Sequence, residues 1–176
     1  DYPAKDEFEL IALKGDDELV GITVANGVQE CVFATNDAQL LRFDANVLRA
    51  QGRAASGVAG INLAAGARAI YFGTVTSSDD VHVVTAANSS DALAGTDAGS
   101  VKVSALTEFP AKGRATGGVR AHKFVRNEDQ LYFAAVVQGE PLALAADGKP
   151  VELPELAKRD ASGTPLASVV GSVGSR

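Results

Sequence analysis

Short runs of alternating apolar and polar residues, separated by turn residues, extend along almost the whole chain. Residues 19–24, 30–35, 39–43 and 58–63 form four such runs, and a further apolar run at 8–13 precedes them. Asn26-Gly27 favours a tight β-hairpin turn between the first two, because both residues tolerate a positive φ. No segment carries an apolar stripe with helical spacing. The pattern therefore predicts an all-β chain.

The same order of runs returns twice further along the chain. We expect strands at 70–76, 81–86, 101–104 and 119–125, and then at 130–137, 141–146 and 149–153, with Asp147-Gly148 as the last turn. Residues 88–100 contain mainly small polar residues, which predicts a mobile loop.

An internal repeat accounts for this recurrence. Residues 40–63 and 102–121 both contain the string G-R-A-x-x-G-V, and Arg159 stands where a third copy would place its arginine. The arginines Arg53, Arg114 and Arg159 are therefore the marks of three units. Four strands per unit is typical of propeller-like folds. We expect a lead-in and the last strand of a preceding blade at 1–15, blades at 16–68 and 69–126, and a shorter blade with a tail at 127–176.

The charge distribution changes the functional picture. The chain of 176 residues has a net charge of −6, which by itself argues against a polyanionic partner. The windows 42–68 and 102–126, however, hold ten basic and two acidic residues, or +8, whereas the remainder holds six basic and twenty acidic residues, or −14. The positive charge thus follows the repeated element.

The repeated strings resemble the C-terminal domain of bacterial type IIA topoisomerase A subunits, the gyrase and topoisomerase IV family. The likeness covers nearly the whole chain, and its most specific stretches are Asp17-Glu18-Leu19-Val20-Gly21-Ile22, Ala34-Thr35-Asn36, Leu41-Arg42-Phe43, Gly52-Arg53-Ala54 and residues 108–120. The resemblance implies a β-pinwheel, a propeller-like disc of four-stranded blades that exchange their outer strands. It also implies a non-catalytic domain that binds and bends double-stranded DNA, and presents it to the catalytic core of an ATP-dependent enzyme.

This chain departs from the family pattern in several ways. It holds about three four-stranded blades where five or six are usual, which predicts a partial array, and its acidity is high. The gyrase-box string Q-R-R-G-G-K-G is absent, and residues 51–57 are its nearest echo. These departures favour the topoisomerase IV type or a degenerate gyrase type. The resemblance also implies a cytoplasmic protein associated with the nucleoid, whose partners are the ATPase subunit and the remainder of its own topoisomerase chain.

The candidate DNA-binding residues are the basic side chains of the two positive windows. The glycine-bracketed arginines can meet a phosphate through two hydrogen bonds, or can instead pin neighbouring carbonyls between blades, and the sequence leaves both open. Lys112 and Arg114 form the best pair for the DNA backbone. The full set comprises Arg42, Arg49, Arg53, Lys102, Lys112, Arg114, Arg120, Lys123 and Arg126.

Other chemistry finds little support in the sequence. His82 and His122 lack further ligands at metal spacing, Cys31 lies in a predicted strand, and the paired carboxylates fall at turns. No phosphate-binding loop and no apolar stretch of membrane-spanning length occurs, so we expect no cofactor, no metal and no membrane. A propeller-type protein-interaction module with an acidic surface is the alternative function, and a glycosidase-like propeller is a more distant one.

Overall fold

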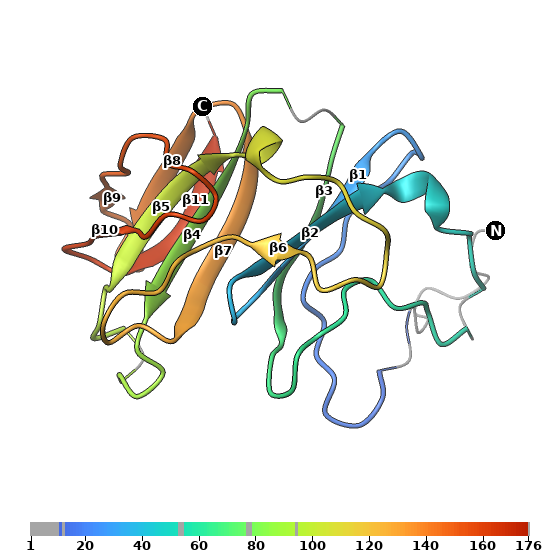
Figure 1. The fold of residues 1–176 in the computed structure, drawn as a ribbon, viewed down its shortest axis with the longest axis horizontal. Coiled ribbons are helices and arrows are strands. Elements are labelled where there is room, and N and C mark those ends of the chain that lie inside the picture. The colour runs from blue at the N-terminus through green and yellow to red at the C-terminus, as the bar shows by residue number, and fades with distance from the viewer. Residues whose placement is uncertain (1–10, 12, 53–54, 77–78, 94, 176) are drawn as a thin grey trace.

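A computed structural model describes residues 11, 13–52, 55–76, 79–93 and 95–175, and these residues form an almost purely β structure (Figure 1). The chain contributes β1 (Glu30–Thr35), β2 (Gln39–Asp44), β3 (Ala69–Val75), β4 (Val81–Asn88), β5 (Ser100–Ala105), β6 (Val119–Arg120), β7 (Gln130–Gln138), β8 (Pro141–Ala145), β9 (Pro150–Val151), β10 (Thr164–Pro165) and β11 (Val170–Ser175). The helical elements among the described residues are two 3-10 turns, η1 (Ala45–Val47) and η2 (Leu106–Glu108).

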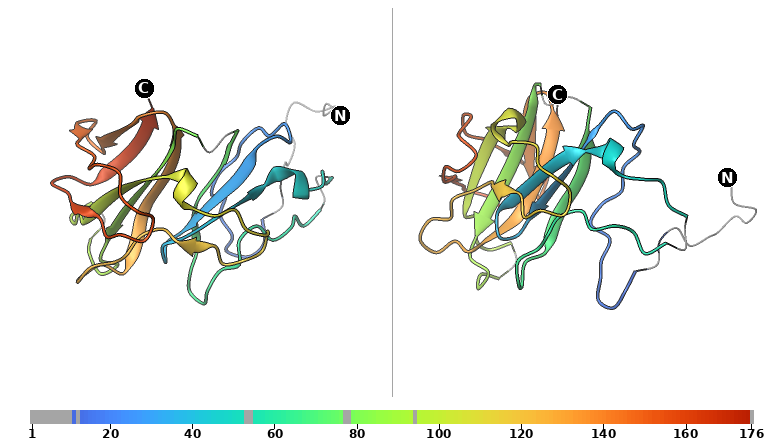
Figure 2. Two further views of the ribbon diagram at one scale, coloured as in Figure 1. Left: turned by 45° about the horizontal axis from the view of Figure 1, so that its top comes forward. Right: turned by 45° about the vertical axis from the view of Figure 1, so that its right-hand side comes forward.

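The strands form three sheets that stand side by side as blades. The strand orders are β3-β1-β2-β6, β10-β5-β4-β7 and β11-β8-β9, and each strand pairs antiparallel with its neighbour. The expected all-β pinwheel architecture is therefore confirmed. Among the described residues, the first two sheets have four strands each and the third has three. Figures 1 and 2 show the second sheet between the other two.

Two apolar cores hold the blades together, one on each side of the second sheet. Val81 and Val83 of β4 pack with Val32, Leu40, Leu106 and Phe109 toward the first blade. Val84 and Ala86 pack toward Ala143 and Val170 of the third blade. Because β4 buries side chains on both of its faces, it is an apolar run with little alternation, as strands covered on both sides are.

The second and third units each lend a strand to the blade before it. β6 follows the second repeat loop but pairs with β2 of the first sheet, and β10 follows the third loop but pairs with β5 of the second. The exchange repeats with the same register in both cases. A residue of the first unit corresponds to the residue 61 positions later in the second unit, and a residue of the second unit corresponds to the residue 45 positions later in the third. The matching pairs are Lys112 N to Arg42 O with Ala157 N to Val103 O, Asn62 N to Thr116 O with Lys123 N to Ala161 O, and Ala121 N to Ala38 O with Leu166 N to Gly99 O.

The units of the sequence do not coincide with single sheets. β3, expected as the first strand of the 69–126 unit, pairs with β1, and β7, expected in the 127–176 unit, pairs with β4. Each sheet consequently draws strands from two or three stretches of the chain.

Several expected strands take another form. Residues 19–24 do not form a strand, and they do not pair with β1, because β2 and β3 occupy both of its edges. Instead they run beside β3, where Thr23 Oγ1 lies 2.9 Å from Thr74 Oγ1. Residues 58–63 also lack a strand, and the expected strand at 119–125 is shortened to β6. The expected strand at 8–13 lies largely outside the described residues.

Candidate nucleic-acid interface

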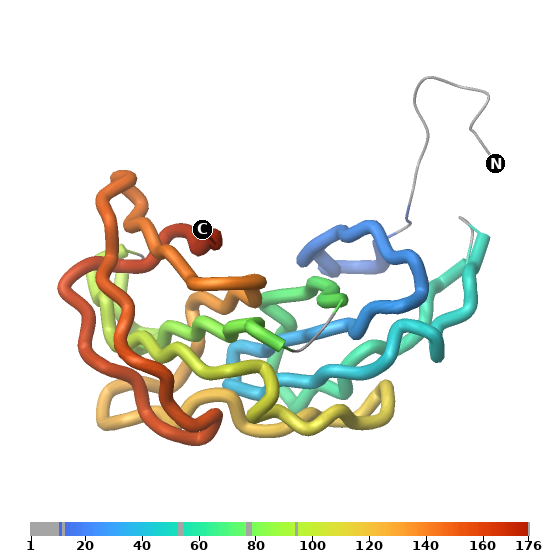
Figure 3. The backbone as a smooth tube through the Cα atoms, turned by 90° about the horizontal axis from the view of Figure 1, so that it is seen from above, coloured from blue at the N-terminus to red at the C-terminus, as the bar shows by residue number. Residues whose placement is uncertain are grey.

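The segments that cross from blade to blade lie next to one another along one edge of the array. We call the described segments 55–63, 110–126 and 157–163 the connector rim. Hydrogen bonds join the first to the second through Asn62 and Thr116, and the second to the third through Lys123 and Ala161. In Figure 3 the middle segment, yellow to orange, follows the edge of the array. The rim thus gathers residues that are distant in sequence.

The repeated arginines fasten the rim. Arg114 Nη1 donates to the carbonyl oxygen of Ala59 at 2.6 Å, and Arg159 Nη1 donates to that of Arg120 at 3.2 Å. Both acceptors lie six residues after the repeat arginine of the preceding unit. The sequence left two roles open for these arginines. The observed hydrogen bonds support the second role, in which the arginine holds a carbonyl oxygen of the neighbouring connector. Arg53 lies outside the described residues.

Five basic side chains of the candidate set are exposed on or beside the rim. Lys112 immediately precedes the second repeat loop, and its backbone N–H is bonded to Arg42 O at 3.0 Å, so its backbone is fixed while its side chain is exposed. The exchanged strand β6 places Arg120 beside Gln39 at the edge of the first blade. The exposed residues are Arg49, Lys112, Arg120, Lys123 and Arg126.

Arg42 occupies a different environment. It lies in β2, its side chain is only 12% exposed, and its Nη1 pairs with Glu30 Oε2 at 3.0 Å. The Arg42 Nε is buried and has no hydrogen-bond partner. An arginine already paired and largely covered has little left to offer a phosphate.

Lys102 departs most from the expectation drawn from its charge. It is 1% exposed in β5, and its ammonium donates to Lys158 O at 3.2 Å and to Arg159 O. Burial lowers the pKa of Lys102 to about 8, while nearby Asp160 opposes that shift and Arg159 adds to it. The structure thus corrects the surface position expected for Lys102: it holds the third repeat loop from inside.

His122 lies in the same buried region. Its Nδ1 is 2.9 Å from Thr85 Oγ1 and its Nε2 is 3.5 Å from Ser100 Oγ, which in turn donates to Glu128 Oε1 at 2.5 Å. Burial, reinforced by the charge of Lys102, lowers the pKa of His122 to about 4. A neutral imidazole at 1% exposure is a structural residue of the joint between the second blade and the connector.

Sequence reasoning left two rim residues out of the candidate set. Lys158 is exposed and Arg159 half-buried in the third connector. The repeat register already aligned Arg159 with Arg53 and Arg114, but the candidate set was drawn from the positive windows 42–68 and 102–126, which exclude both rim residues.

Other kinds of site are sparse in the part of the chain that the structure describes. No group of three His, Cys, Asp or Glu side chains there could hold a metal ion. Cys31 is buried, and burial together with nearby Asp44 raises the pKa of its thiol, which makes it unreactive. None of the described helices has the length and apolar character needed to cross a membrane.

Comparison with known proteins supports one family. A family model described as DNA gyrase C-terminal domain, beta-propeller, matches residues 29–75 and 90–131, which together are half of the chain. The DNA gyrase A protein of Deinococcus deserti is 31% identical over 131 residues, which cover 73% of this chain and 15% of that protein. Its counterpart in Streptomyces coelicolor is 31% identical over 137 residues, with 76% and 15% covered.

Solved structures agree with the sequence relatives. The C-terminal domain of a DNA topoisomerase IV superposes with a TM-score of 0.75 at 25% identity, over 93% of this chain and 51% of that one. A DNA gyrase A C-terminal domain superposes with a TM-score of 0.64 at 19% identity, over 89% and 50%, and that likeness concerns the fold alone. The chain therefore spans about half of these domains and a small part of the full-length relatives.

Proposed function

We propose, because the chain belongs to the family of DNA gyrase C-terminal β-propeller domains, that it binds duplex DNA along the connector rim. The observation that carries the proposal is the series of exposed basic side chains on the second and third connectors, Lys112, Arg120, Lys123, Arg126 and Lys158, with exposed Arg49 ahead of the first connector. Backbone hydrogen bonds hold Lys112 and Lys123 in place, and strand pairing holds Arg120. Lysines and arginines spaced along an edge neutralise successive phosphates and release counterions, whatever the base sequence.

The rim also suits a bent duplex. Smooth bending of a 20–30 bp site by 40–90° costs on the order of 1–6 kcal/mol, and contacts spread over several blades can offset that cost. No described helix is long enough to enter the major groove, since η1 and η2 have three residues each. The domain would thus bend DNA with little sequence preference, and would do no chemistry itself.

The remaining partners follow from the family. The domain would act in the bacterial cytoplasm as the DNA-positioning part of a type IIA topoisomerase. The remainder of the same topoisomerase chain, together with the ATPase partner, would supply cleavage and strand passage.

Mapping the contact surface tests this proposal. Backbone amide NMR shifts should change at 110–126 and 157–163 when a short duplex is added at low salt, and two duplexes of unrelated sequence should give the same map. Changes confined to other surfaces, or none at all, would replace DNA binding by the protein-interaction function. A duplex carrying fluorophores at both ends should show its ends approaching upon binding.

A further inference from the structure

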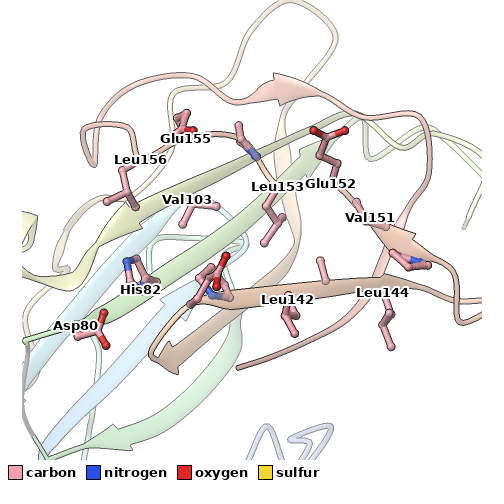
Figure 4. A pocket seen from close by; sticks show the side chains of 15 residues that line it. Asp80, His82, Val103, Leu142, Leu144, Val151, Glu152, Leu153, Glu155 and Leu156 are labelled. Atoms are coloured by element: carbon pink, nitrogen blue, oxygen red, sulfur yellow. The ribbon is translucent and has the colours of Figure 1, made fainter. Parts of the chain in front are cut away.

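The junction between the second and third blades contains an open groove. It has a volume of about 550 Å³, and its lining comes from the start of β4, from Val103, from β8 and from residues 150–156. Figure 4 shows Leu153, Leu156, Glu152 and Glu155 on one wall, with Asp80 and His82 at its end.

A shorter connector explains why this groove exists. Gly99 and Gly148 are the positive-φ residues that open β5 and the β9 edge, and Lys112 and Ala157 make the matching connector contacts. Lys112 follows Gly99 by thirteen positions, whereas Ala157 follows Gly148 by nine. The four missing residues correspond to the stretch that contains η2.

At the first junction that stretch fills the interface. Leu106 and Phe109, three residues apart, are fully buried against Val32, Leu40 and Val83. The third connector offers only Leu153 and Leu156 in their region, and Leu156 remains 58% exposed. An apolar surface that one junction covers with leucine and phenylalanine is thus left open at the other.

The negative charge around the groove favours a positively charged partner. The lining includes Asp80, Glu140, Glu152 and Glu155 but neither lysine nor arginine. Four carboxylates repel DNA and attract a cationic polypeptide, and such complementarity steers association.

The edge beside the groove limits how a partner can dock. Pro150 takes the place in β9 that Leu40 and Val101 take in β2 and β5, where those residues pair with the exchanged strands. Proline has no N–H to give to an added strand, so this edge is protected against strand pairing. A partner must therefore insert side chains into the groove.

We propose that this groove binds a protein segment bearing a large apolar pair, such as leucine and phenylalanine three residues apart, flanked by lysine or arginine. The segment would replace the missing η2 stretch in trans. This site adjoins the third connector but is lined by other residues, and the proposal does not depend on DNA binding.

A peptide taken from the chain itself provides the probe. ALTKFPAK, residues 105–112 with lysine in place of the glutamate, should bind with a dissociation constant on the order of 10⁻⁴ M and shift the amides of 140–144 and 150–156. A peptide with alanine at the leucine and phenylalanine positions should bind at least tenfold more weakly. Leu156→Lys should weaken binding at least tenfold, whereas Leu93→Lys, at a site 77% exposed outside the groove, should not.

Three results would overturn the proposal. One is the absence of amide shifts at millimolar peptide, another is unchanged binding by Leu156→Lys, and the third is a shift pattern outside the groove. Sedimentation that shows self-association through these same residues would instead assign the groove to a second copy of the chain.

Discussion

Single buried polar residues distinguish the second blade from the first. The repeat register places Lys102 where the first unit has Leu41, and His122 where it has Ile61. Leu41 and Ile61 contribute to one apolar cluster, whereas Lys102 and His122 hold their neighbours through hydrogen bonds. Buried polar groups are tolerated when they are bonded, and their geometry restricts which partners fit. The positions that are apolar in the first blade are therefore polar in the second blade, where it meets the third unit.

Lowering the pH should destabilise the folded protein through protonation of His122. Its folded pKa of about 4 lies below the usual 6.5, so the unfolded chain binds the proton first as the pH falls. Stability contributed by the neutral ring is complete above pH 6.5 and is lost down to pH 4, by about 3 kcal/mol. Denaturant unfolding of the wild type and His122→Gln across this range measures the difference between them. Parallel pH profiles for the two proteins would refute this assignment.

At the scale of elements, the blade joint depends on a close backbone approach at the start of β6. Gly118 has φ +75°, and a Cβ there would lie 2.3 Å from Leu40 O. Gly113, in the same connector, has nothing within 4 Å of its ideal Cβ. The two glycines form a matched pair, because only the first lies where the chain enters the neighbouring sheet.

Alanine substitution should separate these two glycines. Gly118→Ala should lower the free energy of unfolding by about 2 kcal/mol or more, since strain and a backbone clash add together. Gly113→Ala should change it by less than about 0.5 kcal/mol. Urea unfolding of both variants measures the effect, and equal stabilities would show that the exchanged strand does not determine the joint.

The sequence predicted elements better than it predicted their partners. The apolar runs of the sequence located β1, β2, β4 and β7 closely, because each run is a local pattern that can be recognised without knowing what packs against it. Which sheet β3 and β6 join depends on contacts between distant segments, and no local pattern encodes it. The burial of Lys102 could not be predicted for the same reason. Its charge is typical of a surface residue, whereas the carbonyl oxygens that accept its hydrogen bonds belong to the third unit.

At the scale of the whole molecule, the array presents surfaces of opposite charge. The connector rim carries exposed lysines and arginines, and the groove at the far junction carries four carboxylates. On the proposed function, the exposed rim is the part of the described chain that would attract DNA, whereas the net charge of −6 would oppose the approach. The proposal therefore predicts weak, salt-sensitive DNA binding.

The salt dependence of DNA affinity tests the central claim most directly. Anisotropy titrations at several salt concentrations should give a dissociation constant on the order of 10⁻⁶ to 10⁻⁴ M at physiological salt. Lys112→Ala with Lys123→Ala should weaken binding on any duplex and flatten the salt slope by about 0.9 per lost contact. Lys14→Ala with Lys149→Ala removes the same charge from exposed sites off the rim and should retain the wild-type slope. Equal weakening by both double variants, or no wild-type binding at low salt, would contradict the account.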